Sequence, residues 1–125
     1  MYSKVAVDTV EERQIEDIEP SLKAVGYELR TDEMRPSVWV FEEGDSNRIH
    51  KHTEQEELYY FIDGSATMEI DNDEIDVEEG DFVAVSPEAW RRISTEEGCT
   101  VFAVGAPNIE GDEILESDID SNDNE

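Results

Sequence analysis

GDSNRIHKHTEQEELYYFIDG, residues Gly44 to Gly64, contains both histidines of this 125-residue chain, His50 and His52, followed after four residues by Glu57. On a β-strand, side chains two residues apart project from the same face, so the two imidazole rings can converge on one point. Two histidines and one carboxylate form a ligand set that suits iron, manganese, zinc, nickel or copper. The simpler interpretation is a pair of surface histidines beside a loop, but the spacing around the pair favours a metal site.

Apolar runs of strand length surround this stretch. SVWVF precedes it, LYYFI lies within it, and FVAVS and TVFAV follow it. Turn residues recur between these runs about every ten residues, a spacing typical of a small antiparallel sandwich or barrel. Ala66, Met68 and Ile70 alternate with polar residues in SATMEI, which is the pattern of a half-buried strand. The sequence therefore predicts an all-β fold.

Turn signals set the limits of the predicted elements. LYYFI is predicted to end at Asp63-Gly64, and SATMEI at the Asp-Asn-Asp turn that follows it. Before the histidines, PSLKAV, which Pro20 opens, predicts a helical turn, and GYELR predicts a strand. These limits divide the chain into an N-terminal extension over residues 1–26, a barrel domain over 27–109 and an acidic, flexible tail over 110–125.

The spacing around the histidines also matches a known motif. It consists of a glycine, five residues, a histidine, one residue, the second histidine, four residues, a glutamate, six residues and a closing glycine. In this the chain resembles the small single-domain cupins over about residues 27–106. The resemblance implies a double-stranded β-helix, a barrel of the jelly-roll type. It also implies that His50, His52 and Glu57 bind a divalent metal inside the barrel, where cupins carry out dioxygenation, isomerisation or decarboxylation.

A second cupin-like motif, GDFVAVSPEAWRRIST, keeps its first residue, Gly80, but departs from the family pattern afterwards. Ser86 stands in place of the usual proline, Glu88 in place of the usual glycine, and Arg91 in place of the third histidine. Arginine stays protonated and has no lone pair to offer, so Arg91 cannot be a metal ligand. The resemblance therefore implies an altered site with three protein ligands and a lowered metal affinity.

Two roles are open to Arg91. Its guanidinium suits bidentate binding of a substrate carboxylate or phosphate, and it equally suits pairing with neighbouring acids at the surface. Arg92 follows directly, and strand alternation sends only one of the two into the barrel. Tyr59 and Phe61 share the face of Glu57, so they either line a substrate pocket or belong to the packed core.

Three functions agree with these residues. The first is a protein that binds a divalent metal and a small anionic metabolite, with the reaction left open. The second is a non-catalytic ligand-binding or dimeric interaction module with a degenerate metal site. The third is a purely structural barrel whose histidines hydrogen-bond to Glu57. Leu58, Tyr60 and Ile62 point away from the barrel and form an apolar outer face, which predicts a homodimer.

Acidic residues dominate the whole chain, because 35 Asp and Glu stand against 9 Lys and Arg, for a net charge of −26. Such a surface repels phosphate backbones and anionic lipid, which argues against nucleic-acid and membrane binding. The apolar runs argue against disorder, so the composition predicts an acidic, halophilic protein that needs salt to screen its own charge. Cys99, the single cysteine, predicts a buried free thiol. Without a long apolar segment, the protein is predicted to be cytoplasmic.

Overall fold

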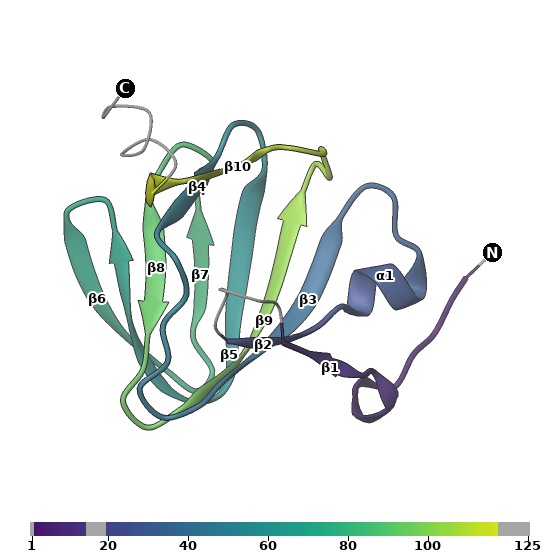
Figure 1. The fold of residues 1–125 in the computed structure, drawn as a ribbon, viewed down its shortest axis with the longest axis horizontal. Helices are drawn as coiled ribbons and strands as arrows, with labels where there is room; N and C mark the ends of the chain where they lie inside the picture. The colour runs from purple at the N-terminus through teal and green to yellow at the C-terminus, as the bar shows by residue number, and fades with distance from the viewer. Residues whose placement is uncertain (1, 15–19, 118–125) are drawn as a thin grey trace.

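The protein folds as a curled antiparallel sheet with a short helix packed at one side (Figure 1). The computed structural model describes residues 2–14 and 20–117. Strands make up 50% of the structure and helix 9%. The predicted all-β class, a jelly-roll barrel, is therefore confirmed.

Ten strands, one α-helix and one 3-10 helix are the regular elements named below, and residues 116–117 are helical as well. In chain order they are the 3-10 helix η1 (Val7–Thr9), β1 (Glu12–Arg13), β2 (Ser21–Lys23), α1 (Val25–Leu29), β3 (Arg35–Phe41), β4 (His50–His52), β5 (Glu56–Ile70), β6 (Asp73–Glu78), β7 (Phe82–Val85), β8 (Arg91–Ser94), β9 (Cys99–Ala106) and β10 (Glu113–Leu115). The strands pair in the order β1-β2-β3-β9-β5-β8-β4-β10, and β6 and β7 also pair with β5.

The long strand β5 joins the two halves of the barrel, because it changes neighbours along its length. Its first half pairs with β7 and β9, and its second half pairs with β6 and β8. The sequence predicted two strands here with a turn at Asp63-Gly64, and that prediction is wrong. The pairing register shifts between Phe61 and Asp63, and Gly64 takes a positive φ of 78° directly against the backbone of Cys99. The strand therefore bends at this point without ending.

The segment before β3 differs from the prediction in two places. GYELR, predicted as a strand, lies largely in α1, and Arg30 caps this helix in the left-handed conformation with a φ of 59°. PSLKAV, predicted as a helical turn, contains β2, in which Ser21 pairs with Val40 of β3. Local propensity failed here because pairing with the barrel edge and the packing of Gly26 against Pro36 outweigh it.

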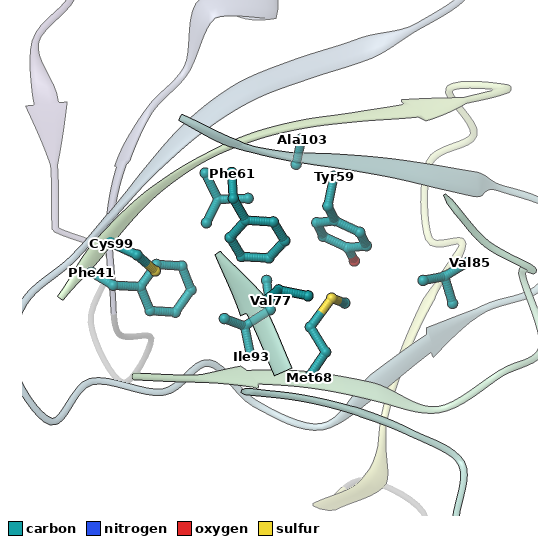
Figure 2. Packing of buried hydrophobic residues seen from close by; sticks show 10 residues of the cluster. Phe41, Tyr59, Phe61, Met68, Val77, Val85, Ile93, Cys99 and Ala103 are labelled. Atoms are coloured by element: carbon teal, nitrogen blue, oxygen red, sulfur yellow. The ribbon is translucent and has the colours of Figure 1, made fainter. Parts of the chain in front are cut away.

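An apolar core fills the interior of the barrel (Figure 2). Met68 is fully buried, and Ala66 and Ile70 pack beside the core partly buried, which confirms the alternation predicted for this segment. Figure 2 shows the side chains of Tyr59 and Phe61 pointing toward Met68 from the opposite side of the barrel. The cluster consists of Phe41, Tyr59, Phe61, Met68, Val77, Val85, Ile93, Cys99, Val101 and Ala103.

The outer side of β5 carries exposed apolar side chains, as predicted. Leu58 is 36% and Ile62 40% exposed. Tyr60 stacks on Phe82 of β7, with ring centroids 4.4 Å apart, and Phe82 itself is largely exposed. The homodimer that this face suggests stays a prediction.

The C-terminal strand β10 lies along the free edge of β4, in residues that the sequence predicted to be a tail (Figure 1). Residues 15–19 of the predicted extension and 118–125 of the predicted tail lie outside the described residues. Within the described part, no helix combines the length and the apolar character that crossing a bilayer requires. The position of β10 matters for the site, because it brings C-terminal residues beside the histidines.

Candidate metal centre

Strand β4 presents both histidines to the barrel interior. His50 is 9% and His52 5% exposed, and their rings meet edge to face with centroids 5.4 Å apart. Lys51 lies between them on the opposite face, where its ammonium is 4.6 Å from the ring centre of Trp90. The strand alternation predicted from the sequence is therefore present, and the two imidazoles share one site.

One carboxylate oxygen, Oε1 of Glu57 on β5, lies at the centre of the cluster. Nε2 of His50 is 3.3 Å and Nε2 of His52 is 3.2 Å from this oxygen. The hydroxyl of Tyr59 donates to it at 2.7 Å, and Nε and Nη2 of Arg91 lie 3.2 and 3.1 Å away. The three residues predicted as ligands are thus brought together, while metal binding by them stays a prediction.

The other nitrogen of each imidazole faces its own acceptor. Nδ1 of His50 lies 3.0 Å from the carbonyl oxygen of Arg48, and Nδ1 of His52 lies 3.2 Å from Oδ2 of Asp112. A carbonyl oxygen accepts hydrogen bonds and cannot donate, so Nδ1 of His50 carries the hydrogen. The carboxylate of Asp112 favours the same tautomer for His52. In the neutral rings, both Nε2 atoms therefore direct a lone pair at Glu57.

The electrostatics of the cluster favour a positive charge between the rings and the carboxylate. Lone pairs that face a carboxylate oxygen at this distance repel it, unless a proton or a metal ion lies between them. Burial alone lowers the pKa of His50, but Glu57 raises it above its ordinary value. Burial also raises the pKa of Glu57, but the contacts with His50 and His52 hold it well below its usual range. Within the described residues, neither nitrogen of His52 makes an aligned hydrogen bond.

Arg91 points into the barrel, whereas Arg92 points away from it. Arg91 is 1% exposed, and its Nε and Nη2 face Glu57. Its Nη1 donates to three backbone carbonyl oxygens, those of Ser86, Pro87 and Ala89, at 3.4, 2.9 and 2.6 Å. Arg92 pairs instead with Glu69, at 2.9 Å. The Arg91 guanidinium is therefore a built-in cation of the site, and its predicted contact with a substrate stays a prediction.

The two aromatic residues predicted to bound a substrate pocket belong to the core cluster. Phe61 has no exposed surface and Tyr59 is 3% exposed. Burial, with the charge of Glu57, raises the pKa of Tyr59 well above its usual value, so the hydroxyl stays protonated and donates to Glu57. Tyr59 thus positions the carboxylate. Contact of either ring with a substrate stays a prediction.

Two carboxylates of the C-terminal segment also belong to the site, and the sequence predicted neither. Asp112 accepts hydrogen bonds from the backbone N–H groups of Glu54 and Gln55, each at 2.9 Å, and also faces His52. Burial raises the pKa of Asp112, but these hydrogen bonds outweigh that effect and lower it. A carboxylate oxygen of Glu113 lies within 4.8 Å of a ring nitrogen of each histidine. The only signal was the short apolar pair after them, which the acidic composition of the tail obscured.

The fold and this cluster define a jelly-roll barrel with histidine and carboxylate side chains gathered inside it. The sequence pattern of the cupin domain matches residues 37–105, more than half of the chain. The chain belongs to the cupin family. Uncharacterized protein MJ1618 of Methanocaldococcus jannaschii is 34% identical over 50 residues, which are 40% of this chain and 40% of that protein. The match thus spans less than half of that relative's length.

Solved structures of cupins resemble this fold. One is a sugar phosphate isomerase from the cupin superfamily of Silicibacter pomeroyi, with a TM-score of 0.74 at 20% identity, over 85% of this chain and 76% of that one. Another is a predicted oxalate decarboxylase of Thermotoga maritima, with a TM-score of 0.74 at 14% identity, over 85% of this chain and 100% of that one. At these identities the likeness concerns the fold alone.

Proposed function

We propose that this cupin binds a divalent metal ion through Nε2 of His50 and His52, with the carboxylate of Glu57 as a third ligand. The observation that carries the proposal is the approach of both Nε2 atoms to one oxygen of Glu57, at 3.3 and 3.2 Å. His52 is buried, yet its nitrogens have no aligned hydrogen-bond partner among the described residues. Buried polar atoms without partners are rare in folded proteins and often mark an ion or a water.

The charges around the cluster agree with a divalent ion. Arg91 contributes one positive charge, and Glu57, Asp112 and Glu113 contribute three negative charges. With both imidazoles neutral, the sum is +1 − 3 = −2. Uncompensated charge is costly where it is buried, as at Glu57 and Asp112, and less so at the exposed Glu113. One divalent cation would balance this sum. In the absence of metal, protons on the imidazoles would partly do so, and metal and protons then compete for the same nitrogens.

The chain's own residues prepare the ligands. The carboxylate of Asp112 lies 3.2 Å from the outer nitrogen of His52, where carboxylates are commonly found behind a metal-bound histidine. Tyr59 and Arg91 fix the orientation of Glu57 from two sides. When bound, a metal would supply Lewis-acid or oxygen-activating chemistry at this position.

We further propose a small anionic metabolite as the organic ligand. Support comes by analogy from the two similar structures, because sugar phosphates and oxalate, for which those proteins are named, are small anions. The contacts argue against Arg91 as the anion clamp, since it is 1% exposed and its Nε and Nη1 already donate to oxygens of the chain, although Nη2, 3.1 Å from Glu57, has no aligned hydrogen bond. An anion would therefore be held at the open positions of the metal.

The direct test is isothermal titration calorimetry with Mn²⁺, Co²⁺ and Zn²⁺ on untagged protein, stripped of metal and kept in high salt. We expect one ion per chain, and an ion supplied at 100 times its Kd should stabilise the fold by about 2.7 kcal/mol. His50→Ala and His52→Ala should each abolish both effects. Lys51→Ala is the matched control, because Lys51 lies between the histidines on the opposite face, and it should bind like the wild type.

Two outcomes would refute the metal site. If the wild-type protein binds none of the three ions, the histidines serve only a structural purpose. If both histidine variants bind as well as the wild type, the ion occupies another place. A melting curve of each metal-free variant shows whether it is folded.

We also propose that the protein works in the cytoplasm of a salt-loving cell. The net charge of −26 and the buried, free thiol of Cys99 support this. Repulsion among carboxylates weakens as salt shortens the screening length, so the melting temperature should rise between about 0.1 M and about 3 M KCl. A melting temperature that stays constant over this range would contradict the salt adaptation.

The apolar outer side of β5 and β7 supports the proposal of a homodimer. Leu58, Ile62 and Phe82 are exposed there, and burial of such a patch by a second copy stabilises association. Sedimentation equilibrium should give twice the 14.2 kDa chain mass. Phe82→Glu should give the monomer mass, whereas Tyr27→Ser, at an exposed aromatic residue elsewhere, should leave the dimer intact. A monomeric wild-type protein would exclude the dimer.

A further inference from the structure

We propose that Glu113 of β10 is a ligand of this metal and makes up for the ligand that is lost because Arg91 replaces the family's third histidine. The inference rests on the proposed metal site. Strand β4 has a neighbour on each side. On the β8 side His50 pairs with Arg91, and on the β10 side His52 pairs with Glu113. The histidine strand therefore lies between a cation that cannot ligate and a carboxylate that can.

The pairing register places Glu113 on the correct face. Residues directly opposite each other in an antiparallel pair point to the same side of the sheet. Glu113 is opposite His52, so its side chain shares the face of both histidines. The distances agree, because the carboxylate oxygen of Glu113 and a nitrogen of each imidazole all lie within 4.8 Å of one another. Two ligands at ordinary distances of about 2.0–2.2 Å from one ion lie at most about 4.4 Å apart, so a small shift of the side chains brings all three within reach of a single ion.

The backbone around Glu113 is fixed against the histidine strand. The N–H of Thr53 donates to the carbonyl oxygen of Asp112 at 3.1 Å, and the N–H of Glu116 donates to the carbonyl oxygen of Ile49 at 3.1 Å. The side chain of Asp112 adds two further hydrogen bonds to the turn that follows β4. Glu113 therefore lies between two anchored points, and a ligand held in place before binding loses little entropy.

The carboxylate of Glu113 is available at both oxygens, whereas one oxygen of Glu57, Oε1, already has several partners. Oε1 of Glu57 already receives the hydroxyl of Tyr59 and two nitrogens of Arg91. No hydrogen bond or ion pair holds the Glu113 side chain among the described residues, and it is exposed. A second negative ligand also offsets the repulsion between a divalent ion and the guanidinium of Arg91, which a neutral histidine would not do. An independent sign that a cation belongs here comes from His52, whose buried nitrogens lie 3.2 Å from carboxylate oxygens of Glu57 and Asp112 without an aligned hydrogen bond.

The test is the affinity for Co²⁺ and Zn²⁺, measured by calorimetry, together with the visible absorption of the Co²⁺ complex. Loss of a residue that hydrogen-bonds to a metal ligand commonly lowers the metal affinity about 10–100-fold. Loss of a direct ligand in Glu113→Gln should therefore lower it about 100-fold or more. The Co²⁺ spectrum should change as well. Glu113→His, which offers another ligand atom, should restore tight binding with a shifted spectrum. Glu110→Gln removes the same charge from the preceding turn and serves as the matched control, with wild-type affinity expected.

The outcomes separate this inference from the function on which it rests. If Glu113→Gln binds both ions like the wild type while His52→Ala does not bind, Glu113 is not a ligand and the metal site stands. If Glu110→Gln loses as much metal affinity as Glu113→Gln, the loss comes from a general effect of negative charge, and Glu113 is not a ligand. If the wild-type protein binds no metal, both proposals fail. Equal melting temperatures of the metal-free variants would show that Glu113→Gln acts on the metal and not on folding.

Discussion

The interior of this barrel has an apolar part and a polar part, and the two are built on the same strands. In β8, Arg91 and Ile93 are two residues apart and both point inward. In β5, Glu57 and Tyr59 belong to the polar part or border it, whereas Phe61 is purely apolar. The apolar part comprises Phe41, Phe61, Met68, Ile93, Cys99 and Val101, and the polar part comprises His50, His52, Glu57 and Arg91.

The two parts differ in how much each side chain depends on its neighbours. An apolar side chain contributes roughly in proportion to the area that it buries, about 25 cal/mol per Å², so its contribution is largely its own. A buried charge is favourable only while its partners are present, because its desolvation must be offset by contacts. The polar part should therefore fail as a set, whereas the apolar part should weaken step by step.

The largest effect is expected for Arg91→Met. The change leaves Glu57 buried beside two imidazoles without its main counter-ion, and removal of one partner of a buried ion pair commonly costs about 3–5 kcal/mol. Urea unfolding in high salt with a chelator present measures this loss. The same variant should bind metal more tightly than the wild type, because the positive charge beside the ion is gone.

A second substitution tests whether the cost comes from the orphaned charge. Glu57→Gln in the Arg91→Met background removes that charge while the Tyr59 hydroxyl keeps an acceptor. The double variant should therefore be more stable than Arg91→Met alone. If the double variant is the less stable of the two, the cost of Arg91→Met comes from lost packing and backbone hydrogen bonds, and the view of the polar part as a set is wrong.

A smaller effect is expected for Ile93→Val, the matched change in the apolar part. Ile93 lies on the same strand and the same face as Arg91, and it is 3% exposed. Loss of one buried methyl group in an Ile→Val change typically costs about 0.5–1.5 kcal/mol. Urea unfolding should show this loss, and calorimetry should show an unchanged metal affinity. A change in metal affinity as large as that of Arg91→Met would show that the two parts are coupled through β8.

The apolar part was predictable from the sequence, and so was the meeting of the first three polar residues. The alternation in SATMEI predicted that Met68 points inside, and the motif that contains His50 and Glu57 predicted that these two side chains meet. The first prediction depends only on strand periodicity, which is local, whereas the meeting with Glu57, on another strand, rests on the resemblance to the cupin motif. The bend of β5 at Gly64 was not predictable in this way. A glycine that can take a positive φ indicates a turn as readily as a bend within a strand, and only the neighbouring strand distinguishes the two.

The rest of the site depends on contacts between distant segments. Asp112 and Glu113 reach the histidines because β10 pairs with β4, and in an acidic C-terminal stretch only a short apolar pair marks such a pairing. Arg91 was recognised as a misfit, but its three bonds to backbone carbonyls follow from the shape of the loop before β8. The sequence therefore predicts the ligand types, whereas tertiary pairing determines which carboxylates are free to bind.

The smallest effect concerns Cys99, the ionisable group of the apolar part. Burial is the largest cause that raises the pKa of its thiol, from about 9 to about 11. The apolar part therefore keeps Cys99 neutral, whereas the polar part keeps Glu57 charged. At pH 8 the folded protein then holds about a hundredfold less thiolate than the unfolded chain. A thiol reagent should react slowly with native protein and rapidly in urea. Because the raised pKa favours the protonated form, its contribution to stability is complete below about pH 9 and declines as the pH rises toward 11. Rapid labelling of the native protein at pH 8 would show that the apolar part opens to solvent. It would then not be a sealed core, and this difference from the polar part would be wrong.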